Sequence, residues 1–251
     1  MIDERKVDRV RVLGVSVDSL KADRAVNLTI RYLEKHKFEY IVFANTPAAL
    51  AGKEENMETY IDHAALVLPG DANIEDAVEA RAWLEEGRFY QAEYFRRLFT
   101  RLNKQRASVY LMVEKEDQLS KIQRIMHEKY SRLQMEGGLW QQDGSIDGLV
   151  NSINGLAPDI LFICAGHDKM SSFLGEHACK INAGLCVCME EVVTDAATDI
   201  SEWMHASKFQ KTVYELKNQI SRFFHDFLFK KEMKQVKQEE EAPKEDLIEK
   251  T

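Results

Sequence analysis

Two polar side chains follow directly on the apolar run YIVFA, where a loop would present them at the end of a strand. They are Asn45 and Thr46, and their amide and hydroxyl groups suit hydrogen bonds with sugar hydroxyls. The alternative is structural, because Thr46 could cap a helix that begins at Pro47. The sequence leaves both interpretations open.

One carboxylate, Asp71, follows the apolar run ALVL in a Pro-Gly turn. A partly buried carboxylate beside a ligand can act as a general base. Asp and Gly are also favoured in tight turns for their backbone conformation alone. Asp71 is therefore the candidate catalytic residue, with turn chemistry as the alternative.

The stretch DILFICAGHDKMSSFLGEH, residues 159–177, is an apolar run that stops at Gly166 and opens a helix. The glycine would let the backbone turn closely, and the N–H groups at a helix start attract an anion. Lys169 would add a full charge, whereas Asp168 would repel a phosphate unless it only caps the helix. We interpret Gly166, His167 and Lys169 as a candidate phosphate-binding group, although HDKMSS is not a Gly-rich phosphate loop.

Sequence motifs for several other chemistries are missing. The chain contains no G-x-G-x-x-G, G-x-S-x-G or H-E-x-x-H motif, so dinucleotide binding, nucleophile-elbow hydrolysis and zinc proteolysis have no support. A metal site built from Cys164, His167, Cys186 and Cys188 lacks paired CxxC spacing. We expect the cysteines to be buried thiols and the protein to use no metal or cofactor.

Composition indicates a folded protein that does not bind nucleic acid. Of 251 residues, 45% are hydrophobic and 30% charged, and the formal net charge of -8 opposes general binding to phosphate backbones. The first ten residues contain no apolar signal region, and no run of about eighteen apolar residues occurs. We therefore expect a cytoplasmic protein.

Short apolar runs alternate with helical patterns along most of the chain. Several are almost continuously apolar, which is typical of parallel strands buried on both faces. The expected fold is α/β, a Rossmann-like parallel sheet of about six strands flanked by helices, over residues 1–195. A weaker run lies near 133–140, and Ser19 is placed to cap the first helix. The six main runs are 10–15, 40–44, 65–68, 108–113, 159–165 and 184–189.

A different pattern follows this domain. Apolar residues from Phe209 to Phe227 recur at alternating steps of four and three, which predicts one long amphipathic helix within an appendage at 196–235. Its apolar side could pack on the domain, mediate self-association as a coiled coil, or lie on a membrane surface. Residues 236–251 are charged and lack a core pattern, so we expect a disordered acidic tail.

The order of these landmarks resembles the WecG/TagA/CpsF glycosyltransferases. The segments that carry the resemblance are VLGVSVDSL, FANTPAAL, ALVLPGD, SVYLMVEK, APDILFICAGHDKMSSFLGEH and SEWM, within residues 9–205. It implies an inverting α/β enzyme that transfers N-acetylmannosamine or a similar N-acetylhexosamine from a UDP-sugar donor to a lipid-diphosphate-linked acceptor. Such reactions serve teichoic-acid or other cell-surface polysaccharide synthesis, with the helical appendage at the inner face of the membrane.

Several positions depart from the family's pattern. The family's Leu-Pro-Asp-Gly, whose Asp is the proposed base, corresponds to Leu-Pro-Gly-Asp ending at Asp71, and its Thr-x-Asn corresponds to Asn45 followed by Thr46. In the family's Gly-x-Pro-Lys-Gln-Glu, only Gly166 and Lys169 survive. Larger side chains also replace family glycines, which would crowd a nucleotide; these are Val113, Glu114, Cys186 and Cys188.

Two functions follow from these observations. In the first, Asp71 deprotonates the acceptor, Asn45 and Thr46 hold the donor sugar, and the helix start at Gly166 to Lys169 offsets the leaving-group charge. In the second, the chain keeps the fold but not catalysis and acts as a binding or scaffold partner of an active glycosyltransferase complex. The first requires Asp71 and Lys169 to face one bound diphospho-sugar.

Overall fold

The computed structural model describes most of the first two hundred residues and a short C-terminal segment. The chain divides into two compact units, Met1–Ala206 and Ser207–Thr251. The described residues are 7–35, 37–52, 54–81, 89, 91–140, 146–190 and 229–234.

The first unit is built on a six-stranded sheet in the order β4-β3-β8-β7-β5-β6. Every neighbouring pair is parallel. The four central strands read as continuous apolar runs because they are buried on both faces. This confirms the predicted α/β Rossmann-like fold. The strands are β3 Tyr40–Ala44, β4 Leu66–Pro69, β5 Ser108–Val113, β6 Gln134–Leu139, β7 Ile160–Cys164 and β8 Leu185–Met189.

The run 10–15 is not part of this sheet, so that expectation was wrong. Leu13 and Gly14 make a turn that splits it into an antiparallel hairpin of β1 (Arg9–Val12) and β2 (Val15–Asp18). The sixth place in the sheet belongs to β6, the weaker run. That strand is a half-exposed edge with two glycines, which explains its weak apolar signal.

The hairpin is held to the sheet by a buried carboxylate. Asp18 is 2% exposed, accepts the Val67 N–H at 2.7 Å and pairs with Arg9 at 2.8 Å. Because β4 is an edge strand, its outward N–H needs such a partner. Ser19 does not cap the first helix: the cap position is Lys21, without a side-chain hydrogen bond.

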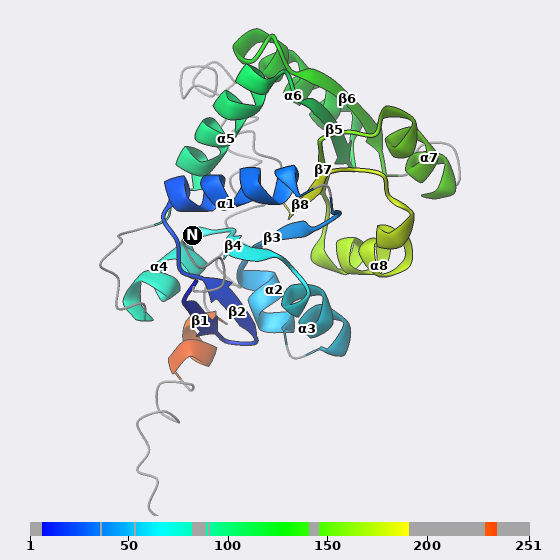
Figure 1. Cartoon of the computed structure of the whole chain (residues 1–251). Helices are drawn as coiled ribbons and strands as arrows, with labels where there is room; N and C mark the ends of the chain where they lie inside the picture. Colours follow the sequence, from blue (N-terminus) through cyan, green and yellow to red (C-terminus); the bar gives the residue numbers. More distant parts are fainter. Residues whose placement is uncertain are drawn as a thin grey trace, which may run out of the picture. The chain divides into compact units, whose positions relative to one another are not determined.

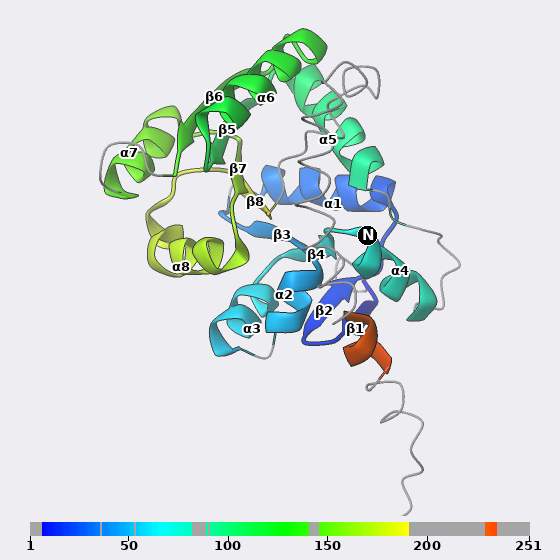
Figure 2. The same cartoon turned by 180° about the vertical axis from the view of Figure 1, so that it is seen from behind.

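Helices cover both faces of the sheet (Figures 1 and 2). On one face lie α1 (Ala22–Glu34), α5 (Gln91–Gln105) and α6 (Glu116–Lys129). The opposite face carries α2 (Thr46–Ala51), α3 (Glu55–Asp62), α7 (Ile146–Leu156) and α8 (His167–His177), which is followed by a 3-10 turn, Ala178–Lys180. The remaining helix, α4 (Ala72–Arg81), follows the edge strand β4.

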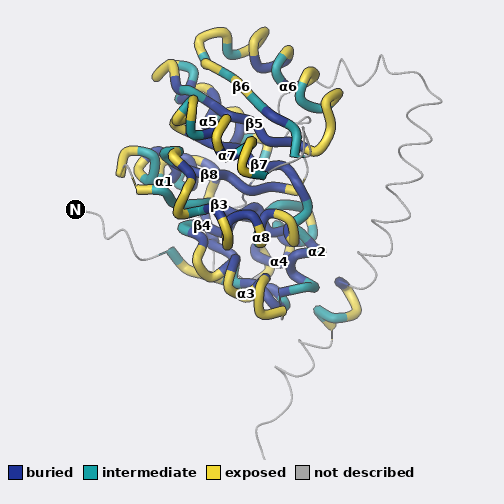
Figure 3. Tube along the Cα trace, turned by 90° about the vertical axis from the view of Figure 1, so that its right-hand side faces the viewer, coloured by how far each residue is buried: buried dark blue, intermediate teal, exposed yellow. Residues whose placement is uncertain are grey.

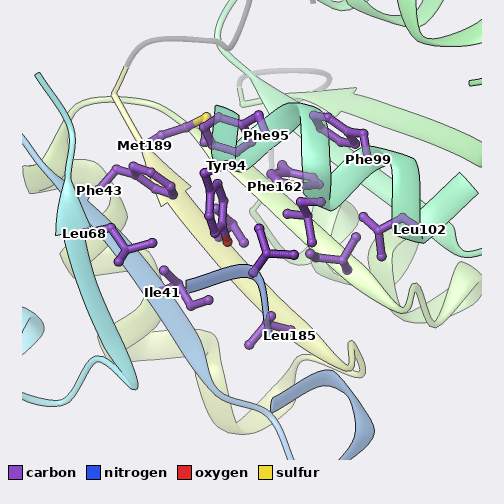
Figure 4. Packing of buried hydrophobic residues seen from close by; sticks show 14 of the residues in the cluster. Ile41, Phe43, Leu68, Tyr94, Phe95, Phe99, Leu102, Phe162, Leu185 and Met189 are labelled. Atoms are coloured by element: carbon purple, nitrogen blue, oxygen red, sulfur yellow. The ribbon is translucent and has the colours of Figure 1, made fainter. Parts of the chain in front are cut away.

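Aromatic rings dominate the layer between the sheet and α5 (Figure 4). Phe43 lies 5.0 Å from Phe95 between ring centroids, and Phe99 lies 5.4 Å from Phe162. The buried Tyr94 hydroxyl shares a 2.8 Å hydrogen bond with Thr29, so its polar group is satisfied. The strands β3, β4, β5, β7 and β8 are buried along almost their whole length, while the helices expose their outer faces (Figure 3). This core fixes the strand ends from which the loops project.

In the second unit, residues 229–234 form a helix, in agreement with the predicted C-terminal helical appendage. The Phe209–Phe227 seam, its three alternatives and the 236–251 tail lie outside the described residues. The boundaries at 195 and 235 stay predictions. None of the helices that the structure describes is both long enough and apolar enough to cross a membrane.

Candidate functional site

The parallel sheet brings the predicted site residues to one edge. Asn45 follows β3, Asp71 lies just beyond β4 and Gly166 lies just beyond β7. Two residues that sequence analysis did not select as ligand-binding, Glu114 after β5 and Glu190 after β8, lie at the same edge. Ligands of open α/β sheets bind outside the carboxyl ends of their strands.

A topological switch point lies between β5 and β7. From β5 the chain continues through α6 to the outer strand β6, whereas from β7 it returns through α8 to β8. Neighbouring loops that diverge in this way leave the crevice where such sheets bind ligands. Strand β4 is three strand spacings from β7, about 14 Å. Only an extended ligand can therefore reach both Asp71 and the start of α8.

Asp71 connects two helix starts. Its Oδ2 accepts the Thr46 N–H at 2.6 Å, at the start of α2, and its Oδ1 accepts the Ile74 N–H at 3.0 Å, in the first turn of α4. Asp71 therefore caps two helix starts, a structural role other than the turn chemistry considered above. It does not exclude catalysis, because each carboxylate oxygen offers a second acceptor position. The two hydrogen bonds fix the carboxylate in one orientation.

Asn45, and not Thr46, caps α2. The Asn45 Oδ1 accepts the Ala48 N–H at 3.0 Å, so its Nδ2 points away from the helix and donates to the Glu190 carboxylate. Thr46 is 2% exposed, and its hydroxyl accepts a hydrogen bond from Asn73 at 3.2 Å. The alternative that Thr46 caps this helix was therefore wrong. That Thr46 binds the donor sugar stays a prediction.

The start of α8 is open on its solvent side. Gly166 has φ -59° and ψ 145°, a conformation that any residue adopts. The turn therefore does not require a glycine, contrary to expectation. No atom lies within 4 Å of the position a Cβ would take, which leaves space at this turn. No side chain caps the helix. An anion placed there would meet the partial positive charge of the helix start.

One ion pair bridges the two loops at the switch point. Lys169, in the first turn of α8, pairs with Glu114 beyond the end of β5. Their side chains are 48% and 38% exposed. Exposed ion pairs contribute about 0–1 kcal/mol, so a charged ligand can displace this one.

His167 lies inside the protein. Its side chain is 5% exposed, and its ring centroid is 6.1 Å from that of Tyr60 on α3. Neither ring nitrogen makes a hydrogen bond of normal geometry, although an interaction with the Phe43 backbone favours the protonated ring. The predicted substrate contact of His167 can thus come only from its backbone N–H at the start of α8.

Comparison with known protein families finds a match over most of the chain. The sequence model of the glycosyl transferase WecG/TagA/CpsF family matches residues 10–229. The chain belongs to this family. A comparison with curated proteins finds no match. Membership of the WecG/TagA/CpsF family supports a glycosyltransferase role, with a sugar donor and an acceptor as binding partners.

The chain's Leu-Pro-Gly-Asp order, which departs from the WecG/TagA/CpsF pattern, has a steric cause. A Cβ on Gly70 would lie 2.8 Å from the Phe43 carbonyl oxygen and 2.9 Å from that of Ala44. The Gly70 N–H also donates to the Ala44 oxygen at 2.7 Å. In this backbone a side chain cannot stand at position 70, so the carboxylate of the turn must come from Asp71.

The larger residues at other WecG/TagA/CpsF glycine positions fall into two groups. Val113, Cys186 and Cys188 are fully buried in β5 and β8, whereas Glu114 lies in the loop after β5 and is partly exposed. Of these four residues, only Glu114 presents an exposed side chain that a nucleotide could meet. Cys164 is buried as well, but Cys179 is exposed, so the expectation of buried thiols fails there. Among the described residues, no group of His, Cys, Asp and Glu side chains is arranged to hold a metal ion.

We expect His167 to make stability depend on pH below neutrality. Burial lowers the pKa of its side chain to about 4, although the neighbouring Asp168 opposes this change. The unfolded chain takes up the proton near pH 6.5 and the folded chain only near pH 4, so stability is complete above pH 6.5 and falls below it. The loss between pH 7 and 5 should be about 2 kcal/mol.

Urea unfolding at the two pH values measures this loss. His167→Leu should remove most of the dependence, whereas the exposed control His127→Gln should retain it. Equal pH dependence in the wild type and His167→Leu would contradict the assignment.

Proposed function

We propose that this chain is an inverting glycosyltransferase that transfers an N-acetylhexosamine, of the N-acetylmannosamine type, from a UDP-sugar to a lipid-diphosphate-linked acceptor. The reaction would contribute to a cell-surface polysaccharide of the teichoic-acid type. A lipid-linked acceptor is anchored in a membrane. The protein, which we place in the cytoplasm, would therefore act at the inner face of that membrane.

The chemical step is a single displacement. The acceptor hydroxyl oxygen attacks the anomeric carbon of the donor sugar, and the bond from that carbon to the UDP oxygen breaks. The acceptor proton passes to the Asp71 carboxylate, and UDP leaves with the electron pair of the broken bond. Attack opposite to the leaving group inverts the anomeric centre. Partial charge at the start of α8 and the charge of Lys169 would stabilise the leaving diphosphate.

The observation that carries this proposal is the fixed Asp71 carboxylate at the edge that also holds the start of α8. Two backbone N–H groups hold the carboxylate, with no long side chain to order. A base prepositioned in this way needs no reorganisation when the acceptor arrives. Their strands are about 14 Å apart, so the Asp71 carboxylate and the Lys169 side chain would have to reach the anomeric carbon and the diphosphate from opposite sides, across β3 and β8.

The second candidate function is a family member without catalysis that acts as a binding or scaffold partner of an active glycosyltransferase complex. Two contacts favour it. Lys169 is paired with Glu114, and both Asp71 oxygens accept backbone N–H groups. A site whose polar groups satisfy one another can persist without a ligand.

Calorimetric titration with UDP and UDP-N-acetylmannosamine separates the two functions. We expect saturable binding to the full chain, weakened about tenfold or more in Lys169→Ala, because a charge-assisted hydrogen bond to phosphate is lost. Lys180→Ala, in the 3-10 turn that follows α8, is the matched control and should bind as the wild type does. Absence of heat at millimolar nucleotide would refute the donor-binding site and favour the scaffold function.

A further inference from the structure

The amide of Asn45 presents its donor, Nδ2, at the loop edge. Its Oδ1 is used by the Ala48 N–H at the start of α2, and this contact sets the orientation of the whole amide. The Nδ2 therefore faces the loop edge, where it donates to Glu190. A sugar hydroxyl is both a donor and an acceptor. Because the Asn45 donor faces the edge, a second residue is better placed to accept the hydroxyl proton of such a ligand.

Glu190 supplies a charged acceptor beside the Asn45 donor. It is exposed and directly follows β8, the strand that lies between β3 and β7 at the centre of the edge. A carboxylate offers about four acceptor positions, so it can accept from Asn45 and from ligand hydroxyls together. Charged acceptors also make shorter and stronger hydrogen bonds than neutral ones.

The connection from Gly166 to Glu190 has the layout of a nucleotide-binding βαβ unit. Strand β7 ends in an open turn, α8 follows, and parallel β8 ends next to Glu190. In dinucleotide-binding units with this order, the phosphate lies at the helix start, and an acid about 20 residues further accepts a hydrogen bond from a ribose hydroxyl. Glu190 comes 24 residues after Gly166, although the Gly-rich signature of those units is missing.

We propose that Glu190 and Asn45 form a hydroxyl-binding pair for a ligand whose phosphate lies at the start of α8. Glu190 accepts hydrogen bonds from vicinal hydroxyls of the ligand's sugar, and Asn45 donates to the same group. This inference rests on the proposed donor-binding site and adds a residue that sets its selectivity for sugars. The vicinal hydroxyls belong either to the ribose or to the hexosamine of the donor.

The test is Glu190→Gln, which preserves the size of the side chain. The new amide would turn its oxygen toward Asn45 and its NH2 toward the ligand, so no acceptor would face the hydroxyls. We expect the Kd for UDP-N-acetylmannosamine to rise about tenfold, the value for a hydrogen bond to a charged group. Glu176→Gln, at the exposed end of α8, is the matched control and should leave the Kd unchanged. Thermal unfolding of both variants checks that the fold is retained.

Three ligands distinguish the source of the hydroxyls. A penalty of Glu190→Gln with UDP that disappears with 2′,3′-dideoxyuridine diphosphate assigns the pair to the ribose. A penalty seen with UDP-N-acetylmannosamine but not with UDP assigns it to the hexosamine. Equal Kd values for the wild type and Glu190→Gln with every ligand, while Lys169→Ala still weakens binding, would overturn this inference alone. Failure of the wild type to bind any of the three would overturn the donor site and the pair with it.

Discussion

Asp71→Asn is expected to lower the rate of glycosyl transfer about a thousandfold, within the range for loss of a general base. The amide has nearly the size of the carboxylate but cannot take the acceptor proton. It also places an NH2 group against one of the two backbone N–H groups that Asp71 accepts, from Thr46 and Ile74. We therefore expect an additional loss of about 1–2 kcal/mol in unfolding free energy. Initial rates of UDP release with the lipid-linked acceptor, and urea unfolding of the same samples, measure the two effects.

The two effects must be separated, because the loss of a helix cap can loosen the neighbouring loops and so lower activity indirectly. Asp62→Asn, at the exposed end of α3, controls for the loss of one negative charge. If Asp71→Asn retains donor affinity and loses turnover, Asp71 is the base. Turnover within tenfold of the wild type, with only the stability loss, would show that Asp71 is a cap and nothing more.

Among the single substitutions, Gly70→Ala should have the largest effect on stability. Its methyl group would lie 2.8 Å from the Phe43 carbonyl oxygen, and that oxygen belongs to the backbone of a buried strand. Because backbone cannot yield as a flexible side chain does, we expect a loss of about 3 kcal/mol in unfolding free energy. The double variant Gly70→Asp with Asp71→Gly, which restores the family's order, should lose more, since it also removes the cap.

Gly166→Ala is the matched glycine control. No atom lies within 4 Å of the position of its Cβ, and its φ of -59° suits alanine. Its unfolding free energy should lie within about 1 kcal/mol of the wild type, because alanine restricts the unfolded chain but is a poorer helix cap than glycine at this position. Equal stabilities of Gly70→Ala and Gly166→Ala in urea unfolding would contradict the steric explanation.

The sheet could be predicted because its central strands are buried on both faces and read as continuous apolar runs. The same criterion failed for residues 10–15, where the turn at Leu13 and Gly14 divides the run into two short strands. It also underrated β6, whose edge position leaves alternate residues exposed. Apolar content reports burial, and burial alone does not say which sheet a strand joins.

The candidate site could be predicted only one loop at a time. Position after an apolar run marked Asn45, Asp71 and Gly166, and all three lie at the same edge. The contacts of Lys169 with Glu114 and of Asn45 with Glu190 join residues far apart in the chain. Those contacts depend on the strand order, which local patterns do not encode. Glu190 carried the same signal as the others, a polar residue directly after an apolar run.

The most direct test of the central claim is a titration of the full chain with UDP-N-acetylmannosamine, followed by backbone amide NMR. If one donor molecule spans the edge, the amides of Thr46 and Asp71 and those of His167 and Asp168 should shift together, with a single Kd. A response confined to one pair of amides, or two different Kd values, would contradict a shared diphospho-sugar site.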